Sequence, residues 1–238
     1  MNAVKDLLKR LIGPTFLGAF DYYRDKDLLE SYGGPFNGQP FRREIVQELV
    51  TISKPTFIVE TGTFRGTSTE HMARLVSVPV HTIEYEGRFY GYSRVRLRKF
   101  PHVHVHNGDS RTVLRELIRG RALPFTRGFF YLDAHWGEDL PLAEELELIF
   151  STWPSALILI DDFQVPNDPG YYFDDYGPGK ALTVDYLLPI QQRFGFSIWF
   201  PACPSARESG ARRGSVVLGQ GDVSEVLALA GTLWRWNK

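Results

Sequence analysis

IVETGTFRGTSTEHMARL, residues 58–75, is the stretch that decides the fold. It begins with a β-branched run typical of a strand, bends at Gly62 and Gly66, and continues with apolar residues at helical spacing. The two glycines allow a tight turn and a close approach of the backbone to a ligand. The hydroxyl residues at 67–69 can cap the helix that follows. The stretch therefore predicts a strand, a ligand-binding turn and a helix, in that order.

The same alternation of strand and helix patterns extends along the chain. Short runs rich in β-branched or aromatic residues are followed by segments of helical spacing, which is typical of βαβ units in a parallel sheet. We therefore predict an α/β fold, with a Rossmann-like, doubly wound and mostly parallel sheet of about seven strands, the last one antiparallel. The parallel strands are expected at TFIVE (56–60), VHTIE (80–84), VHVHN (103–107), FFYLD (129–133) and ALILID (156–161).

The two ends of the chain depart from this alternation. Residues 1–40 are rich in aromatic side chains, and we expect them to form an N-terminal helical cap on a Rossmann-like domain of residues 41–238. Residues 163–179 are rich in Pro, Gly, Asp and Tyr, which indicates a loop. The later runs FSIWF (196–200) and GSVVLG (214–219) are predicted to close the sheet as a hairpin at its edge.

Composition excludes several classes of protein. The net charge of −1 argues against a general nucleic-acid binder, which would carry a basic excess. The single cysteine, Cys203, cannot form an internal disulfide. No run of 18 apolar residues predicts a membrane span, so we expect a cytoplasmic protein. A homo-oligomer is left open.

Acidic residues end each predicted parallel strand or follow it closely. The carboxyl ends of parallel strands lie on one edge of the sheet, and ligands bind outside that edge where the strand order reverses. We therefore expect the carboxylates to gather around one crevice, although each could instead cap the helix that follows it. The five residues are Glu60, Glu84, Asp109, Asp133 and Asp161.

The charge beside the glycine turn indicates the kind of ligand. Glu60 would repel a pyrophosphate, but it suits a ligand that carries an ammonium or a sulfonium group. Glu84 is placed to accept hydrogen bonds from ribose hydroxyls. Asp109 or Ser110 could face an adenine amino group, while a helix N-cap is an equally good interpretation of Asp109.

With these motifs, the chain resembles the class I S-adenosylmethionine-dependent methyltransferases over roughly residues 40–220. VETGTFRGTST is similar to their first motif, TIEYE to their acidic ribose-binding motif, and NGDS to their adenine-contacting motif. The resemblance implies S-adenosylmethionine as the cofactor. The positions implied to bind it are Glu60, Thr61, Gly62, Thr63, Gly66, Thr67, Ser68, Glu84, Asp109, Ser110 and Asp133.

A narrower resemblance concerns YLDAHW and LILIDDF. Together they resemble a metal-dependent branch that includes macrolide sugar O-methyltransferases and cephalosporin hydroxylase-like proteins. The branch implies a magnesium ion held by Asp133, Asp161 and Asp162, and His135 as the base with Asp133 as a second catalytic residue. The branch reads Asp-x-Asp-His at this turn, so His135 stands one position early in this chain.

The resemblance implies a methyl transfer, assisted by magnesium, to a hydroxyl of a small molecule such as a sugar or natural product. The aromatic residues of the loop 163–179 are expected to take part in selecting this acceptor. An NAD-dependent oxidoreductase is an alternative that explains the sheet and Glu84, but not Glu60 or the missing third glycine. A non-catalytic S-adenosylmethionine-binding partner protein and a hydroxylase-like relative remain further alternatives.

Overall fold

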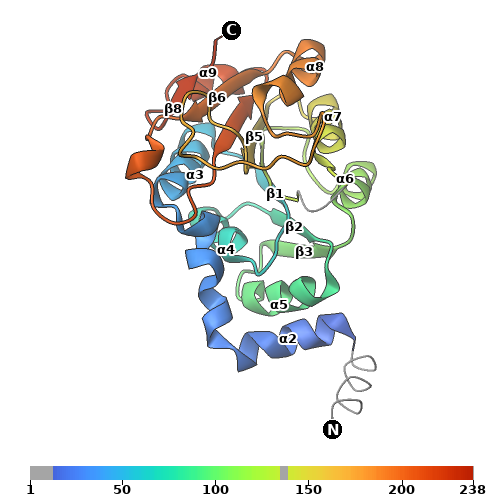
Figure 1. Ribbon diagram of the computed structural model, residues 1–238. Helices are drawn as coiled ribbons and strands as arrows, with labels where there is room; N and C mark the ends of the chain where they lie inside the picture. Colours follow the sequence, from blue (N-terminus) through green and yellow to red (C-terminus); the bar gives the residue numbers. More distant parts are fainter. Residues whose placement is uncertain (1–12, 135–138, 238) are drawn as a thin grey trace.

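The computed structural model describes residues 13–134 and 139–237 of the chain. The described residues form one eight-stranded sheet of order β3-β2-β1-β4-β5-β7-β6-β8, with helices on both faces (Figure 1). The strand order reverses between β1 and β4, which is where doubly wound sheets bind their ligands. The five parallel strands are β1 (Phe57–Thr61), β2 (Val80–Glu84), β3 (Val103–Asn107), β4 (Gly128–Leu132) and β5 (Ala156–Asp161). The predicted fold class is confirmed.

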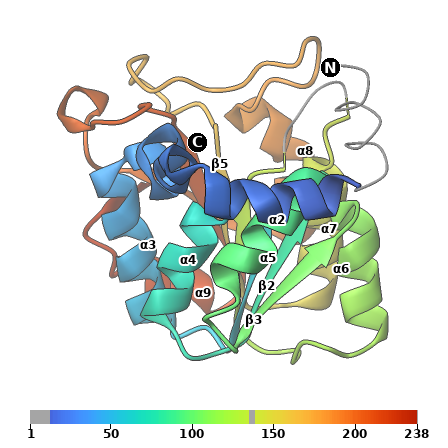
Figure 2. The same cartoon turned by 90° about the horizontal axis from the view of Figure 1, so that it is seen from below.

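Two apolar clusters hold the helices on the sheet. Phe57 and Val59 of β1 point to one face, whereas Ile58 between them points to the other. Figure 2 shows α3 and α4 on one side of the strands and α6 and α7 on the other. The first face is covered by α6 (Ser110–Arg119), α7 (Leu142–Thr152) and α8 (Val184–Phe194), and the second by α3 (Pro40–Ser53), α4 (Thr67–Leu75) and α9 (Val223–Leu227).

The antiparallel end of the sheet differs in one respect from the prediction. β7 (Ser215–Gly219) lies between β5 and β6 (Ser197–Pro201) and runs antiparallel to both, as a closing hairpin requires. The hairpin is not the edge, however, because β8 (Leu233–Arg235) pairs with β6 outside it. A three-residue strand is too short to leave a periodic pattern in the sequence, so it could not be predicted.

The N-terminal segment lies against α5 (Gly87–Leu97) and the glycine turn. Helix α2 (Pro14–Arg24) packs across α5 at the bottom of Figure 1, and Arg88 Nε donates to Asp21 at 2.7 Å. Two short 3₁₀ segments, η1 (Lys26–Gly33) and η2 (Pro35–Gly38), then lead to α3. The N-terminal helical cap is therefore present, while the division of the chain at residue 40 stays a prediction. In the described part of the chain, no helix has the length and apolarity needed to cross a membrane.

Candidate active site

The turn after β1 lies at the carboxyl edge of the sheet, next to the ends of β2 and β4. The N–H groups of Gly62 and Thr63 donate to Ile83 O at 3.0 and 3.2 Å, and Asp133 N donates to Thr61 O at 2.9 Å. Gly62 has φ 86°, and a Cβ there would lie 2.3 Å from the carbonyl oxygen of Asp133. Glycine is therefore required at position 62, where the turn after β1 meets the turn after β4.

The hydroxyl groups after the turn do not cap α4, and this expectation was wrong. The N-cap of α4 is Gly66, with a left-handed backbone and no side-chain hydrogen bond. The nearby hydroxyls have other partners, since Ser68 Oγ accepts from Phe36 N at 3.1 Å and the Thr69 hydroxyl donates to Glu60. Among the described residues, no side chain accepts from the N–H groups that begin α4, which leaves them open toward the turn as in a ligand-binding helix N-terminus.

Glu84 is held directly against the glycine turn. Its Oε2 accepts from the backbone N–H of Phe64 at 2.6 Å, and its Oε1 accepts from Glu86 N at 2.8 Å. Burial, with a smaller contribution from the charge of Glu86, raises the pKa of Glu84 to about 7. The structure thus brings together the acid and the turn that the sequence singled out, whereas the contact with a ribose stays a prediction.

Glu60 lies beneath the turn and does not line the pocket above it. Its Oε2 accepts from the hydroxyl of Thr82 at 2.6 Å and from that of Thr69, so it ties β1 to β2 and α4. Burial raises the pKa of Glu60 to about 7. Its predicted role toward a cationic ligand is not tested by these contacts.

A small pocket of about 40 Å³ opens above the turn. Residues of the turn and of α4 form its floor, with Tyr131 and Asp133 at one side and residues of η1 and η2 as its roof. Phe36 anchors the roof, because its ring packs edge-on against Tyr131 at 5.3 Å and is almost fully buried. Predicted site residues that line the pocket are Gly62, Thr63, Thr67, Ser68 and Asp133.

Asp109 is a helix cap. It accepts hydrogen bonds from Arg111 N at 3.0 Å and Thr112 N at 3.3 Å, and it forms an ion pair with the Arg111 guanidinium. The structure therefore supports the capping interpretation of this residue. Ser110, the first residue of α6, is buried beside it.

Glu145 of α7 is a candidate that the sequence analysis missed. Its carboxylate is fully buried, and within residues 13–134 and 139–237 neither of its oxygens has a hydrogen-bond partner of ordinary geometry, although the hydroxyls of Ser110 and Thr61 lie close enough to lower its pKa. Burial raises the pKa of Glu145 to about 7. Helical spacing could have revealed it, because Glu145 follows Leu142 and precedes Ile149 by three and four residues on the buried side of α7.

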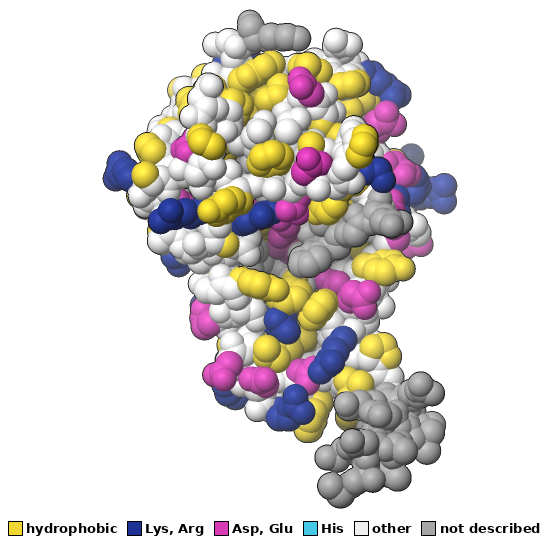
Figure 3. Space-filling view, in the orientation of Figure 1, with side chains coloured by type: hydrophobic (Ala, Val, Ile, Leu, Met, Phe, Trp, Pro, Cys, Tyr) yellow, Lys and Arg dark blue, Asp and Glu magenta, His cyan; other side chains and the backbone are white. Residues whose placement is uncertain are grey.

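The carboxylates after β4 and β5 lie close together and meet two arginines. Asp161 pairs with Arg42 of α3 and accepts from the Tyr131 hydroxyl at 2.6 Å. Asp162 accepts from Arg213 Nε at 2.5 Å. His135 lies outside the described residues. In the space-filling view, acidic side chains lie in a hollow across the middle of the face (Figure 3).

The carboxyl groups of Asp133, Asp161 and Asp162 have different pKa values because their surroundings differ. Burial raises the pKa of Asp161, but the charge of Arg42 and hydrogen bonds from Tyr131 and Arg42 hold it below its ordinary value. Burial and the charge of Asp161 raise the pKa of Asp162 to about 7. Burial and both neighbouring aspartates raise the pKa of Asp133 well above its ordinary value. Asp133 is the one among them that faces the pocket.

Arg42 and Arg213 were also missed by the sequence analysis. Arg42 precedes Ile45, Val46 and Leu49 on the buried side of α3, and a charged residue at that spacing indicates a buried partner. Arg213 lies in a turn-rich connection with no periodic pattern, so no signal in the sequence singles it out.

The loop between β5 and α8 divides its aromatic residues between core and surface. Tyr171 is buried and donates to Cys203 O at 2.9 Å, whereas Tyr172 is exposed. The Tyr176 hydroxyl donates to Asp174 at 2.6 Å, and Asp174 pairs in turn with Arg213. A second cavity, of about 320 Å³, is lined by residues 164–169 and 171–173. The loop is therefore tied to the carboxylate cluster, while its role in selecting an acceptor stays a prediction.

Comparison with known proteins finds similarity in structure alone. No family model matches the chain, and no curated protein sequence matches it. Among solved structures, TomG from Streptomyces achromogenes, an O-methyltransferase involved in tomaymycin synthesis and solved with SAM, has a TM-score of 0.56 at 19% identity, over 88% of this chain and 91% of that one.

Two further structures are similar over most of their length. The O-methyltransferase from Bacillus cereus in complex with SAH has a TM-score of 0.57 at 16% identity, over 92% of this chain and 97% of that one. Cofactor-bound Rv0187 from MTB has a TM-score of 0.59 at 18% identity, over 89% and 90%. The chain has the Rossmann-like fold of S-adenosylmethionine-dependent O-methyltransferases.

Proposed function

We propose that the chain is an S-adenosylmethionine-dependent methyltransferase that acts on a hydroxyl group of a small-molecule acceptor. The observation that carries the proposal is the hydrogen bond between Glu84, at the end of β2, and Phe64, in the turn after β1 and next to the reversal of strand order. Doubly wound folds bind nucleosides at this point, with an acidic residue for the ribose. The SAM and SAH bound to structurally similar O-methyltransferases support the same choice of ligand.

The turn and its surroundings offer a place for each part of the donor. Glu84, at the end of β2, would accept hydrogen bonds from the ribose hydroxyls. The uncapped N-terminus of α4 would receive the carboxylate of the methionine part, because backbone N–H groups and the helix dipole favour an anion there. Ser110, which begins α6, would lie toward the adenine. Gly62 would let the backbone approach the donor closely.

Methyl transfer needs alignment and the removal of a proton. The sulfonium loses its charge as the acceptor oxygen attacks the methyl carbon in line, and positioning of this kind can contribute roughly 7–11 kcal/mol. The hydroxyl proton must also leave. Asp133 lines the pocket, and its raised pKa makes the ionised carboxylate a better proton acceptor than an ordinary aspartate. The predicted role of His135 as the base stays a prediction.

The magnesium ion implied by the sequence resemblance does not fit the contacts of its proposed ligands. Asp161 and Asp162 are engaged by Arg42, Tyr131 and Arg213. Within residues 13–134 and 139–237, no three His, Cys, Asp or Glu side chains are grouped to hold a metal ion. The proposed methyl transfer therefore involves no metal.

Calorimetry and an acceptor panel test the proposal. We expect the purified protein to bind S-adenosylhomocysteine and to ignore NAD, and to transfer labelled methyl groups to hydroxyl compounds. The Asp133→Asn variant should lose roughly 10²–10⁴-fold in turnover. The exposed Asp185→Asn serves as the matched control. Binding of NAD instead would identify an oxidoreductase, and donor binding without any transfer would favour the non-catalytic alternative.

A further inference from the structure

Two arginine side chains enter the carboxylate cluster from opposite ends of the chain. Arg42 comes from the first turn of α3, and Arg213 comes from the segment that precedes β7. The Arg42 guanidinium donates to Asp161 with one nitrogen and to the carbonyl oxygen of Arg213, at 2.5 Å, with another. Arg42 and Asp161 are 2% and 1% exposed, so this ion pair has essentially no access to water.

The oxygen atoms of Asp161 and Asp162 have defined partners. Oδ1 of Asp161 accepts from Arg42 and from the backbone N–H of Asp162, and its Oδ2 accepts from the Tyr131 hydroxyl at 2.6 Å. A carboxylate has about four lone-pair sites, so Asp161 retains little capacity for a metal. Oδ1 of Asp162 accepts from Arg213 Nε, while the other end of that guanidinium pairs with Asp174.

Arg213 is held in place by its backbone as well as by its side chain. Its N–H donates to Gln39 Oε1 at 2.7 Å, and its carbonyl oxygen accepts from Gln39 Nε2 at 3.0 Å and from Arg42. Gln39 is 1% exposed. Because Gln39 and Arg42 both belong to the start of α3, this segment fixes the position of both cations relative to the strand ends.

The charges explain why a divalent ion has no place here. An isolated buried carboxylate is costly unless a cation or hydrogen bonds offset it, and a guanidinium remains protonated in proteins. The two arginines already supply positive charge to Asp161, Asp162 and Asp174. A metal could reach Asp161 only by displacing Arg42, which would leave a buried guanidinium without its partner.

We infer that Arg42 and Arg213 take the place of the divalent cation in this carboxylate cluster, so that methyl transfer in this protein needs no metal there. This inference rests on the proposed function for its catalytic part. Arg42 acts as a positioning residue, because through Asp161 it orients the Tyr131 hydroxyl beside the pocket. Within the described residues no cation pairs with Asp133, which leaves this carboxylate available to the acceptor.

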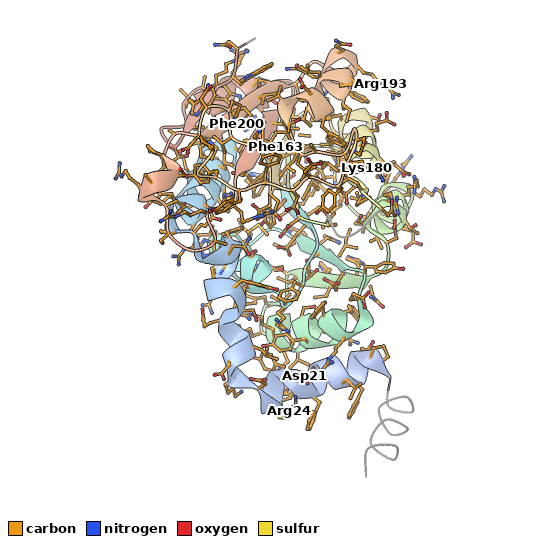
Figure 4. All side chains as sticks on the ribbon, viewed as in Figure 1. Asp21, Arg24, Phe163, Lys180, Arg193 and Phe200 are labelled. Carbon is orange, nitrogen blue, oxygen red and sulfur yellow. The ribbon has the colours of Figure 1, made fainter. Side chains whose placement is uncertain are left out.

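Manganese binding tests the inference without any assay of activity. Mn²⁺ is titrated into the full-length protein and followed by electron paramagnetic resonance of the free ion. We expect wild type to bind no Mn²⁺ at millimolar concentration, and Arg213→Met, which frees Asp162 beside Asp133, to gain one site. The control is Arg193→Met, which removes an exposed pair with Glu147 on the periphery of α8 (Figure 4) and should behave as wild type.

The outcomes separate this inference from the proposed function. One equivalent of Mn²⁺ bound by wild type and lost in Asp161→Asn would overturn the inference, as would turnover that EDTA abolishes and Mg²⁺ restores. A folded Arg213→Met variant that gains no Mn²⁺ site would also overturn the inference, since Arg213 would then not be taking the place of a metal ion. If Arg213→Met does not fold, the titration of wild type with Mn²⁺ still tests the inference. S-adenosylhomocysteine binding is measured on the same samples, and its absence contradicts the proposed function alone.

Discussion

Gly62 and Asp133 approach each other so closely that a Cβ on Gly62 would lie 2.3 Å from the carbonyl oxygen of Asp133. This contact joins the turn after β1 to the turn after β4 at the reversal of strand order. The two turns carry the residues proposed to hold the donor and to receive the acceptor proton. The fold therefore brings these two turns together through one close approach of their backbones.

Gly62→Ala should disturb both stability and donor binding. The added methyl group meets backbone at a positive φ, so we expect a loss of more than about 2 kcal/mol in the free energy of unfolding. Gly177→Ala is the matched control, because Gly177 also has a positive φ, but none of the described atoms lies within 4 Å of an added Cβ. It should cost about 1 kcal/mol from backbone strain alone. Equal losses in urea denaturation would contradict the close contact.

The roof of the pocket should contribute to donor affinity. Residues of η1 and η2 line one side of the pocket of about 40 Å³ above the turn, where the donor is proposed to bind. Tyr32 lines this roof, 5.6 Å from the Phe64 ring between centroids, and is exposed. Tyr32→Ala should change the free energy of unfolding by less than about 0.5 kcal/mol and weaken S-adenosylhomocysteine binding severalfold.

Phe125→Ala provides the comparison for Tyr32→Ala. Phe125 is also an exposed aromatic residue, but it lies between α6 and β4 and does not line the pocket. The affinity of the Phe125→Ala variant for S-adenosylhomocysteine, measured by calorimetry, should equal that of wild type. The same affinity in both variants would show that the roof does not contact the donor.

Glu145 should make the protein less stable as the pH rises. Its folded pKa of about 7 lies above the value of 4.5 expected in the unfolded chain, so folding favours the protonated form. The contribution of Glu145 to the free energy of unfolding is fully present below about pH 4.5 and is lost as the pH rises through 7. Because one pKa unit corresponds to about 1.4 kcal/mol, the shift from 4.5 to about 7 should make Glu145→Gln more stable than wild type by roughly 3–4 kcal/mol at pH 8.

The same comparison at pH 4 provides the internal check on Glu145. There both wild type and Glu145→Gln carry a neutral side chain, so their free energies of unfolding in urea should agree. The exposed Glu225→Gln is the external control and should follow wild type at both pH values. A Glu145→Gln variant without extra stability at pH 8 would show that Glu145 finds a compensating partner.

Much of the fold was predictable because it rests on local patterns. The strands β1, β2, β4 and β5 are fully buried, and each lies within one residue of its predicted position. The approach of Glu84 to the glycine turn follows from parallel strands ending at one edge. Predicting these features requires only the sequence of each segment and the rule that parallel strands end at the same edge of a sheet.

The contacts that decide the chemistry of the carboxylate cluster were not predictable. The pairs Arg42–Asp161 and Arg213–Asp162 join residues 119 and 51 positions apart, and no local pattern encodes such a distance. The family resemblance assigned these aspartates to a metal because it describes the carboxylates and not the arginines that meet them. The cap of α4 at Gly66 likewise depends on which partner each nearby hydroxyl finds in space.

The central claim is that the edge formed by the turn and Glu84 binds the nucleoside of S-adenosylmethionine. Calorimetry with S-adenosylhomocysteine on wild type, Glu84→Gln and the exposed neighbour Glu86→Gln tests it most directly. We predict binding by wild type and Glu86→Gln, and a loss of roughly tenfold or more in Glu84→Gln, since hydrogen bonds to a charged group contribute about 1.5–3 kcal/mol. No binding by wild type at millimolar ligand, or equal binding by all three proteins, would contradict the claim.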